Sequence, residues 1–269
     1  MPAHQTRFNP LQCRKTQKTL VLAALLIALG APAGLLALDC SDLPSHADLK
    51  AALTTARGES NGGFNLDMWG TLVDRDGIVC AVAFTGNGRG DQWPGSRAIS
   101  AQKANTANAF SLPGLALSTA NLFAAVQPGG SLFGLQESNP VDVNVAYSGA
   151  SLHNGLPTDK MTGKKIGGVN VFGGGLALYN ANGTLVGAVG VSGDSSCADH
   201  NIAWRTRDNL GLDNVPGGVS GDTDRPDNIV FDIADDAGSN PESAGGFGHA
   251  HCLNAAVEDA IAGALPPTS

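Results

Sequence analysis

The sequence is poor in basic and in aromatic residues. Its 269 residues hold 16 Lys and Arg against 24 Asp and Glu, and Phe, Trp and Tyr make up 5% of the chain. Because an acidic surface repels a polyanion, nucleic acid is not an expected partner. Trp69, Trp93 and Trp204 are too scattered to predict a platform for stacking sugars or bases, so packing is their expected role.

The sequence also lacks a charge block or a proline-rich linker that would separate two domains. After a leader is removed, about 230 residues remain, enough for one sizeable core. The glycine run of residues 86 to 90 lacks the G-x-G-x-x-G spacing, and no helix is expected to open on its last glycine. A dinucleotide site is therefore not indicated, and a mobile loop is the simpler reading.

Two further motifs are incomplete. The triplet Asp222, Asp224 and Asp227 lacks the closing glutamate of a twelve-residue calcium loop, which favours a solvated acidic loop. Ser192 lies in Gly-Val-Ser-Gly-Asp, which departs at its last residue from the G-x-S-x-G turn of serine hydrolases. No catalytic residue is assigned from these patterns.

Residues 1–37 have the pattern of a signal peptide. Four basic residues precede the apolar run of residues 20 to 29, and small residues offer cleavage after Ala33 or Ala37. We therefore expect an exported protein, periplasmic or secreted, without stable membrane insertion once the signal is removed. An uncleaved membrane anchor is the alternative. Removal leaves 12 basic against 24 acidic residues, a net charge of −12.

Cysteine usage fits an oxidising compartment. Cys13 leaves with the signal, and an even number remains, which predicts two disulfides. The remaining cysteines are Cys40, Cys80, Cys197 and Cys252. Three pairings are possible, of which we favour Cys197 with Cys252 and Cys40 with Cys80. The alternative is a zinc site at His249-x-His251-Cys252, because imidazole and thiolate are zinc ligands.

Hydrophobic periodicity predicts an α+β order of elements rather than a strict βαβ alternation. Two hairpins turn at residues 74 to 77 and at Asn182-Gly183, a dipeptide that tolerates positive φ. The expected strands span residues 66–73, 78–84, 176–179 and 184–191, with further candidates at 141–147 and 229–233. The expected helices span residues 42–57, 97–110, 115–126, 198–210 and 253–264.

The second hairpin runs into a glycine-rich stretch. Gly187, Gly190 and Gly193 punctuate its last strand, which indicates close approach of another backbone or of a ligand. Ser196, followed three residues later by Asp199, has the pattern of a helix N-cap. The predicted unit is strand, turn, strand and helix.

These residues resemble a known family. The stretch of residues 173–193 is similar to the closing motif of the GlcG/HbpS-like haem-binding (haem-degrading) family, and so are Asp199 and Ala203 that follow it. Residues 96–107 resemble the lysine-bearing helix of the same family. The resemblance implies a profilin-like α+β domain with an antiparallel, roughly five-stranded sheet, helices packed on it, and homo-oligomers. It implies a core at residues 46–212, a loop insertion at 127–168 and a C-terminal tail at 213–269.

The resemblance also implies a haem or related ligand. Haem needs an axial ligand, an apolar slot and cations for its propionates. His200, beside the glycine turn, is the first candidate for axial ligand, and the others are His153 in the long loop and His249 and His251 in the tail. Surface or capping roles are the alternatives for His200 and His153. Arg97 and Lys103 are candidates for binding the propionates. They are six residues apart, so they do not share one helix face closely. For Lys103 the alternative is a charge on the helix surface. Ser192, Gly193 and Asp199 complete the candidate ligand-binding set.

The expected function is an exported protein that binds haem or a related iron or tetrapyrrole ligand. One alternative is an enzyme that degrades haem or acts on a small oxidised metabolite, which requires a proton-transfer group that the sequence does not reveal. The other is a non-catalytic structural or sensory oligomer that uses its long loop and tail as contact surfaces.

Overall fold

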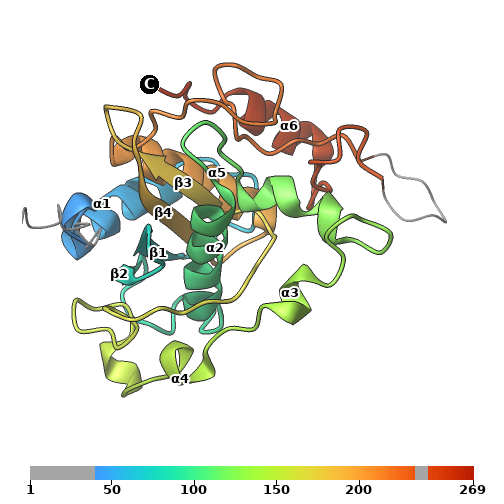
Figure 1. Cartoon of the computed structure of the whole chain (residues 1–269). Helices are drawn as coiled ribbons and strands as arrows, with labels where there is room; N and C mark the ends of the chain where they lie inside the picture. The colour runs from blue at the N-terminus through green and yellow to red at the C-terminus, as the bar shows by residue number, and fades with distance from the viewer. Residues whose placement is uncertain (1–39, 234–241) are drawn as a thin grey trace, which may run out of the picture. The chain divides into compact units, whose positions relative to one another are not determined.

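The computed structural model describes residues 40–233 and 242–269, so the expected signal peptide lies outside the described residues. These residues fall in one compact unit. The α-helices are α1 His46–Arg57, α2 Ser96–Phe110, α3 Leu135–Ser138, α4 Val143–Ala146, α5 Ser196–Asn209 and α6 Ala255–Gly263 (Figure 1). The strands are β1 Trp69–Asp74, β2 Val79–Phe84, β3 Gly175–Tyr179 and β4 Leu185–Ser192. The 3-10 helices are η1 Cys40–Asp42, η2 Thr119–Leu122, η3 Ala124–Val126 and η4 Ser151–His153.

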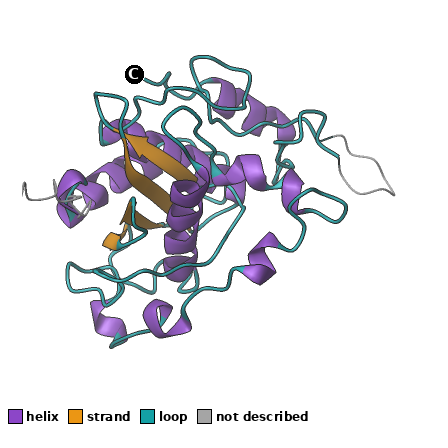
Figure 2. Ribbon diagram, viewed as in Figure 1, coloured by secondary structure: helices purple, strands orange, loops and turns teal. Residues whose placement is uncertain are grey.

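The four strands form one antiparallel sheet in the order β2-β1-β4-β3 (Figure 2). The two predicted hairpins thus lie side by side, joined where β1 pairs with β4 and Leu72 faces Val189. The α+β class is confirmed, but the expectation of roughly five strands is wrong for the described residues. The run at 229–233 extends no ladder, since Ile233 makes only an isolated bridge to Ser243.

Helices cover both faces of this sheet. Helix α2 packs on one face, and α1 and α5 pack on the other (Figure 1). Side chains alternate along β1 accordingly: Leu72 joins the core shared with α1 and α5, whereas Val73 joins the core under the alanines of α2. Helix α2 lies very close to the sheet, because a Cβ at Gly190 would lie 1.9 Å from the Ser100 carbonyl oxygen. This close approach accounts for the glycine inside a strand.

The long insertion at residues 127–168 is ordered by short helices and by one buried ion pair. The strand expected at 141–147 is wrong: Asp142 instead caps α4, accepting the N–H groups of Asn144 and Val145. The Arg97 guanidinium of α2 donates to both carboxylate oxygens of Asp159 and, over 2.7 Å, to the Ala146 carbonyl. Arg97 therefore fixes the insertion to the core.

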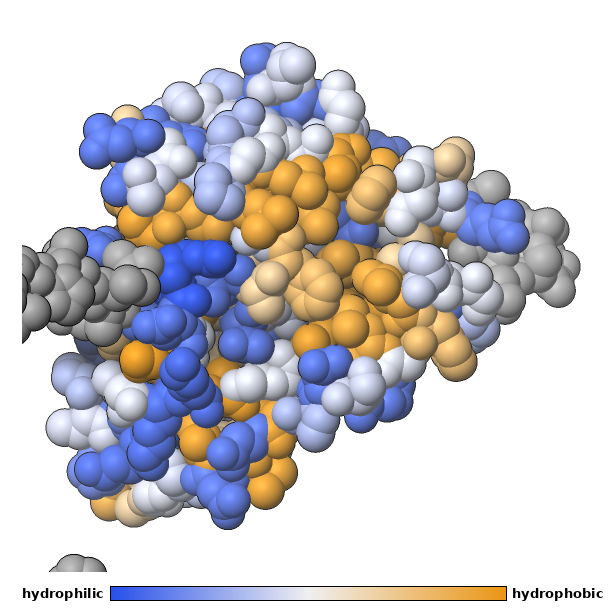
Figure 3. Space-filling model, in the orientation of Figure 1, coloured by the Kyte–Doolittle hydropathy of each residue, from blue (hydrophilic) through white to orange (hydrophobic). Residues whose placement is uncertain are grey.

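The insertion also carries apolar side chains on its surface. Phe133 is 66% exposed and Tyr147 is 72% exposed. Figure 3 shows apolar side chains gathered across the face drawn in Figure 1, with hydrophilic groups between them. Within the described residues, no helix is both long enough and apolar enough to cross a membrane.

Two disulfides join the cysteines in the favoured pairing. Cys40 bonds to Cys80 and Cys197 bonds to Cys252, each with an S–S distance of 2.04 Å. The first ties the segment before α1 to β2. The second ties the C-terminal tail to the first turn of α5. The expected helix at residues 115–126 is present as the two short 3-10 helices η2 and η3.

Candidate functional site

A cleft of about 310 Å³ opens where the first turns of α2 and α5 meet the end of β4. Charged and hydroxyl side chains form its floor, and two aromatic rings stand among its walls. Its lining residues are Trp93, Ser96, Ile99, Lys103, Phe172, Ser192, Asp194, Ser196 and Asp199. Its volume lies at the lower end of the range for small-molecule sites, about 300 to 1,000 Å³.

A buried ion pair forms the polar centre of this cleft. The Lys103 ammonium lies 2.7 Å from Asp199 Oδ2 and donates a second hydrogen bond, over 3.1 Å, to the Val191 carbonyl. Both charged side chains are about 2 to 3% exposed, so the surface role considered for Lys103 is wrong. An ammonium has three N–H donors. One donor of Lys103 therefore remains for a group that enters the cleft.

Glycines allow this ammonium to reach the sheet. Gly174 has a φ of +117°, and a Cβ there would lie 2.4 Å from the Val191 carbonyl oxygen and 3.1 Å from Lys103 Nζ. The glycine-rich run before β3 thus accommodates a lysine side chain and a neighbouring strand. The predicted close approach is confirmed for backbone and side-chain neighbours.

Asp199 is held in place from two sides. Its Oδ2 contacts Lys103, and its Oδ1 accepts the N–H of Asp194 over 2.9 Å. Burial raises the pKa of Asp199 from 3.8 to about 6, and the Lys103 ammonium acts in the opposite direction without cancelling this effect. The charge at the bottom of the cleft consequently changes close to neutral pH.

The aromatic side chains at the cleft are unusually exposed. Trp93 is 52% and Phe172 is 45% exposed, whereas Trp69 and Trp204 are buried. The expected packing role is thus confirmed for Trp69 and Trp204 and is wrong for Trp93. The Trp69 indole N–H donates to the Trp93 carbonyl over 3.0 Å, which fixes the segment that presents Trp93. The cleft offers apolar ring faces beside a buried ammonium.

The structure brings together part of the candidate set. Lys103, Ser192 and Asp199 line the same cleft. Gly193 lies next to it, but a Cβ there would lie 2.5 Å from the Asp67 carbonyl oxygen. A neighbouring backbone segment, not a ligand, therefore accounts for the glycine at position 193.

His200, the first candidate for axial ligand, lies away from the cleft. Its side chain is fully buried, and its Nε2 accepts the N–H of Ile229 over 3.1 Å beside the amide oxygen of Asn228. Burial lowers the pKa of His200 to about 4. The imidazole faces the segment that follows residue 227 and not the cleft. Its position depends on the hydrogen bond from Ile229, which lies 29 positions away in the sequence.

The other two candidates also lie away from the cleft lining. His153 is half-buried in η4, with Nδ1 2.8 Å from Thr158 Oγ1. The guanidinium of Arg97, the candidate propionate partner, is buried and bound to Asp159. Of the predicted ligand-binding residues, Lys103, Ser192 and Asp199 line the cleft, whereas Arg97, His153 and His200 do not.

Sequence reasoning considered Ser196 only as part of a helix N-cap and His249 only as a metal ligand, and it did not bring the two together. Ser196 Oγ lies 3.2 Å from His249 Nε2, and His249 Nδ1 lies 2.6 Å from the Ala250 carbonyl oxygen. The favoured pairing of Cys197 with Cys252 was the available signal, because it places residue 249 near the start of α5.

The alternative zinc site is not assembled. Cys252 is bonded to Cys197 in this structure. His251 stacks on Phe231, with ring centroids 4.2 Å apart, and its Nε2 lies 2.9 Å from Asp259 Oδ1. Its ring is therefore engaged away from His249 and Cys252.

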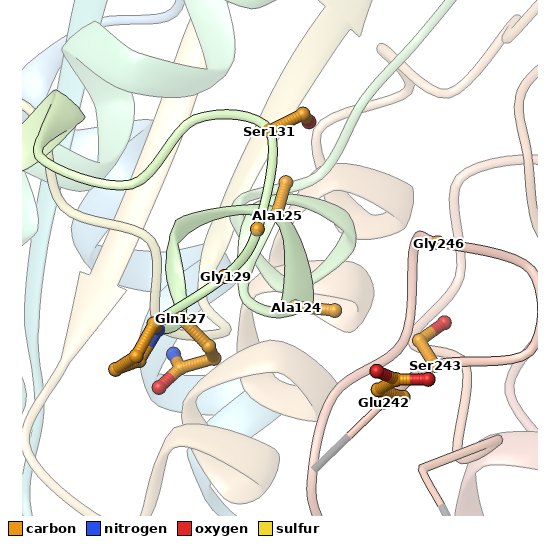
Figure 4. A pocket seen from close by; sticks show the side chains of 10 residues that line it. Ala124, Ala125, Gln127, Gly129, Ser131, Glu242, Ser243 and Gly246 are labelled. Atoms are coloured by element: carbon orange, nitrogen blue, oxygen red, sulfur yellow. The ribbon is translucent and has the colours of Figure 1, made fainter. Parts of the chain in front are cut away.

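A second hollow of about 260 Å³ lies between η3 and the tail (Figure 4). Glu242 and Ser243 lie across it from Ala124. The rest of its wall is formed mostly by alanine, glycine and serine residues, with Gln127 and Pro128. It offers less binding chemistry than the cleft at Lys103.

The chain is an α+β sheet protein with a cleft between the first turns of two helices. The family of haem-degrading HbpS-like proteins matches residues 45–207, and the chain belongs to this HbpS-like family. The resemblance carried by residues 96–107 and 173–193 is thereby confirmed. The matched region runs from the start of α1 almost to the end of α5 and leaves the tail outside.

Similar solved structures exist, whereas no curated protein matches the chain. A structure described as a PduOC:heme complex is 23% identical over 63% of this chain and 96% of that chain, with a TM-score of 0.44. The Klebsiella pneumoniae protein ORFY is 25% identical over 62% and 90%, with a TM-score of 0.42. HbpS is 17% identical over 62% and 86%, with a TM-score of 0.38.

Proposed function

We propose that the protein binds haem or a related flat, carboxylate-bearing tetrapyrrole in the cleft at Lys103. A carboxylate of the ligand accepts the remaining N–H of Lys103, and one edge of the ring system lies between Trp93 and Phe172. The observation that carries the proposal is a buried ammonium with a donor to spare beside two exposed aromatic rings. Membership of a family described as haem-degrading supports the choice of ligand.

The cleft chemistry suits the edge of a tetrapyrrole better than its metal. None of the described residues that line the cleft is His, Met, Tyr or Cys, the usual axial ligands. The proposal therefore rests on the carboxylate and the ring face. It extends to a metal-free tetrapyrrole, which offers the same two features.

A paired titration tests this proposal. The chain without its leader is titrated with ferric haem and, separately, with metal-free protoporphyrin, and absorbance is followed to saturation. We expect saturable binding of both near one ligand per chain, weakened about 2- to 10-fold in Trp93→Ala, because a stacked aromatic pair contributes about 0.5 to 1.5 kcal/mol.

His153→Ala is the matched control, since its imidazole lies away from the cleft lining. Binding of neither compound would contradict the proposal. Loss of binding in His153→Ala together with unchanged binding in Trp93→Ala would place the ligand in the insertion instead. Loss of the haem spectrum on adding a reductant would indicate the alternative function, haem degradation.

We also propose that the protein is exported and self-associates. The leader pattern of residues 1–37 and two disulfides support export, because disulfides persist in oxidising compartments. The exposed Phe133 and Tyr147 support self-association. Cell fractionation and light scattering of the purified chain test the two proposals, and a cytoplasmic or strictly monomeric chain would contradict them.

A further inference from the structure

The wall of the cleft contains a serine hydrogen-bonded to a histidine whose tautomer is fixed by its surroundings. His249 Nδ1 faces the Ala250 carbonyl oxygen at 2.6 Å, and a carbonyl can only accept, so Nδ1 carries the proton. Nε2 then has a free lone pair and lies 3.2 Å from Ser196 Oγ. Two acceptors lie within reach of the Ser196 hydroxyl: Nε2 at 3.2 Å and the disulfide sulfur of Cys252 at 3.3 Å. Nitrogen is the stronger acceptor, so the hydroxyl is placed to donate its proton to Nε2.

Ser196 and His249 have the exposures expected of a nucleophile that meets the substrate and of a base that stands behind it. Ser196 lines the cleft and is partly exposed, whereas His249 is 3% exposed behind it. Burial lowers the pKa of His249 to about 4, which keeps Nε2 unprotonated at neutral pH. The same low pKa makes the imidazole a weak base, so slow turnover is expected.

Three contacts hold His249 in this position. The disulfide from Cys252 to Cys197 ties the tail to the residue that follows Ser196. The imidazole packs on Phe123, with ring centroids 4.5 Å apart. The N–H of His249 donates to the Val230 carbonyl over 2.8 Å. A base that is held by surrounding structure loses little freedom when the reaction occurs.

We propose that Ser196 is a nucleophile activated by His249 and that the cleft hydrolyses small esters with an apolar or aromatic acyl group. Ser196 Oγ attacks the ester carbonyl while its proton passes to His249 Nε2. The C–O bond to the alcohol breaks, and the alcohol leaves with that proton. Water then attacks the acyl-serine by the same route, which releases the acid and restores the hydroxyl.

Donors for the developing oxyanion lie in the same cleft. Ser196 begins α5, and its own backbone N–H has no intrahelical acceptor. The N–H groups of Ala198 and Asp199 are already bound to the hydroxyl and the carbonyl of Ser195. Lys103 has one remaining N–H, as described above. The N–H of Cys197 is not available, because it donates to Cys252 Sγ. Preorganised donors of this kind stabilise tetrahedral intermediates.

The pairing belongs to this chain's own extension. The family match ends at residue 207, and His249 comes from the tail beyond it. The sequence motif for a serine hydrolase failed at Ser192, whereas the structure provides a different serine, four residues later, without that motif. The inference does not depend on haem, because it rests on the contact of Ser196 with His249.

Covalent labelling with a fluorophosphonate, a probe for activated serines, tests the inference on the disulfide-bonded chain. We expect one label per chain, mapped by peptide mass spectrometry to Ser196. Labelling should be lost in Ser196→Ala and slowed about 100-fold or more in His249→Gln, since a positioned general base contributes about 10²- to 10⁴-fold. Ser151→Ala, at an exposed serine of η4, should be labelled like the unmodified chain.

The unmodified chain decides the question even if His249→Gln does not fold. Absence of label at Ser196 after prolonged exposure to the probe would overturn the inference. So would equal labelling rates in folded His249→Gln, because the serine would then react without its base. A label at Ser196 combined with failed tetrapyrrole titrations would support the inference and contradict only the proposed ligand.

Discussion

Replacing Lys103 with methionine tests the buried ion pair at the centre of the cleft. Methionine keeps most of the length of the side chain but removes the ammonium that lies 2.7 Å from Asp199 Oδ2. Removing one partner of a buried pair typically costs about 3 to 5 kcal/mol, because the other charge stays buried without compensation. For a chain of this size, that loss corresponds to a melting temperature lower by about 6 to 20 °C.

The loss should depend on pH in a defined direction. The pKa of Asp199 is about 6 in the folded protein, against an ordinary value of 3.8, so stability falls as pH rises from about 4. In the unmodified protein this fall ends near pH 6. Without Lys103 the pKa of Asp199 is higher still, because the ammonium lowers it, and the fall continues to higher pH.

The two proteins should therefore differ most at pH 8 and least at pH 5. At pH 5 Asp199 is mostly protonated in both, and only the change of side-chain shape remains, at less than about 1.5 kcal/mol. Thermal and urea unfolding at the two pH values measure the difference. Exposed Lys165→Met is the control. Equal losses at pH 5 and pH 8, or a loss no larger than in the control, would refute the reasoning.

Two further substitutions test how the cleft is built. Gly190→Ala places a Cβ 1.9 Å from the Ser100 carbonyl oxygen, so we expect it to lower the free energy of unfolding by at least about 3 kcal/mol or to prevent folding. The control is Gly88→Ala, which has open space around it and should be nearly neutral. Normal stability of Gly190→Ala would contradict the packing of α2 on β4. Asp159→Ala leaves the Arg97 guanidinium buried without its carboxylate and should lower the free energy of unfolding by about 3 to 5 kcal/mol. We also expect faster proteolysis of the 127–168 insertion. An unchanged digestion pattern would show that the ion pair does not fix the insertion.

Much of the fold followed from short-range patterns. The Asn182-Gly183 turn and the apolar runs on either side predicted β3 and β4 within one residue of their observed ends. The start of α5 was placed two residues late and its N-cap one residue late, since the helix begins at Ser196 and Ser195 is the N-cap that accepts the N–H of Ala198. Such features depend on neighbours a few residues apart, which is why the sequence alone reveals them.

Residues whose role depends on distant partners were misjudged. Lys103 carries no sequence signal for burial, and its carboxylate lies 96 positions away. His200 sits beside the glycine-rich turn in the sequence, yet its ring turns toward Ile229 in the tail. Trp93 was assigned to packing, although the contact of its carbonyl with Trp69 leaves its own ring exposed.

The sequence by itself determined the family, the α+β class and the two hairpins. Each of these depends on periodicity, turn chemistry or a contiguous motif. It left three pairings of the cysteines possible, and the structure shows the one that we favoured. Tertiary structure alone decided which polar groups share a cleft. It brought Lys103 to Asp199 and placed His249 behind Ser196, because burial and hydrogen bonding act between groups that are close in space, whatever their separation along the chain.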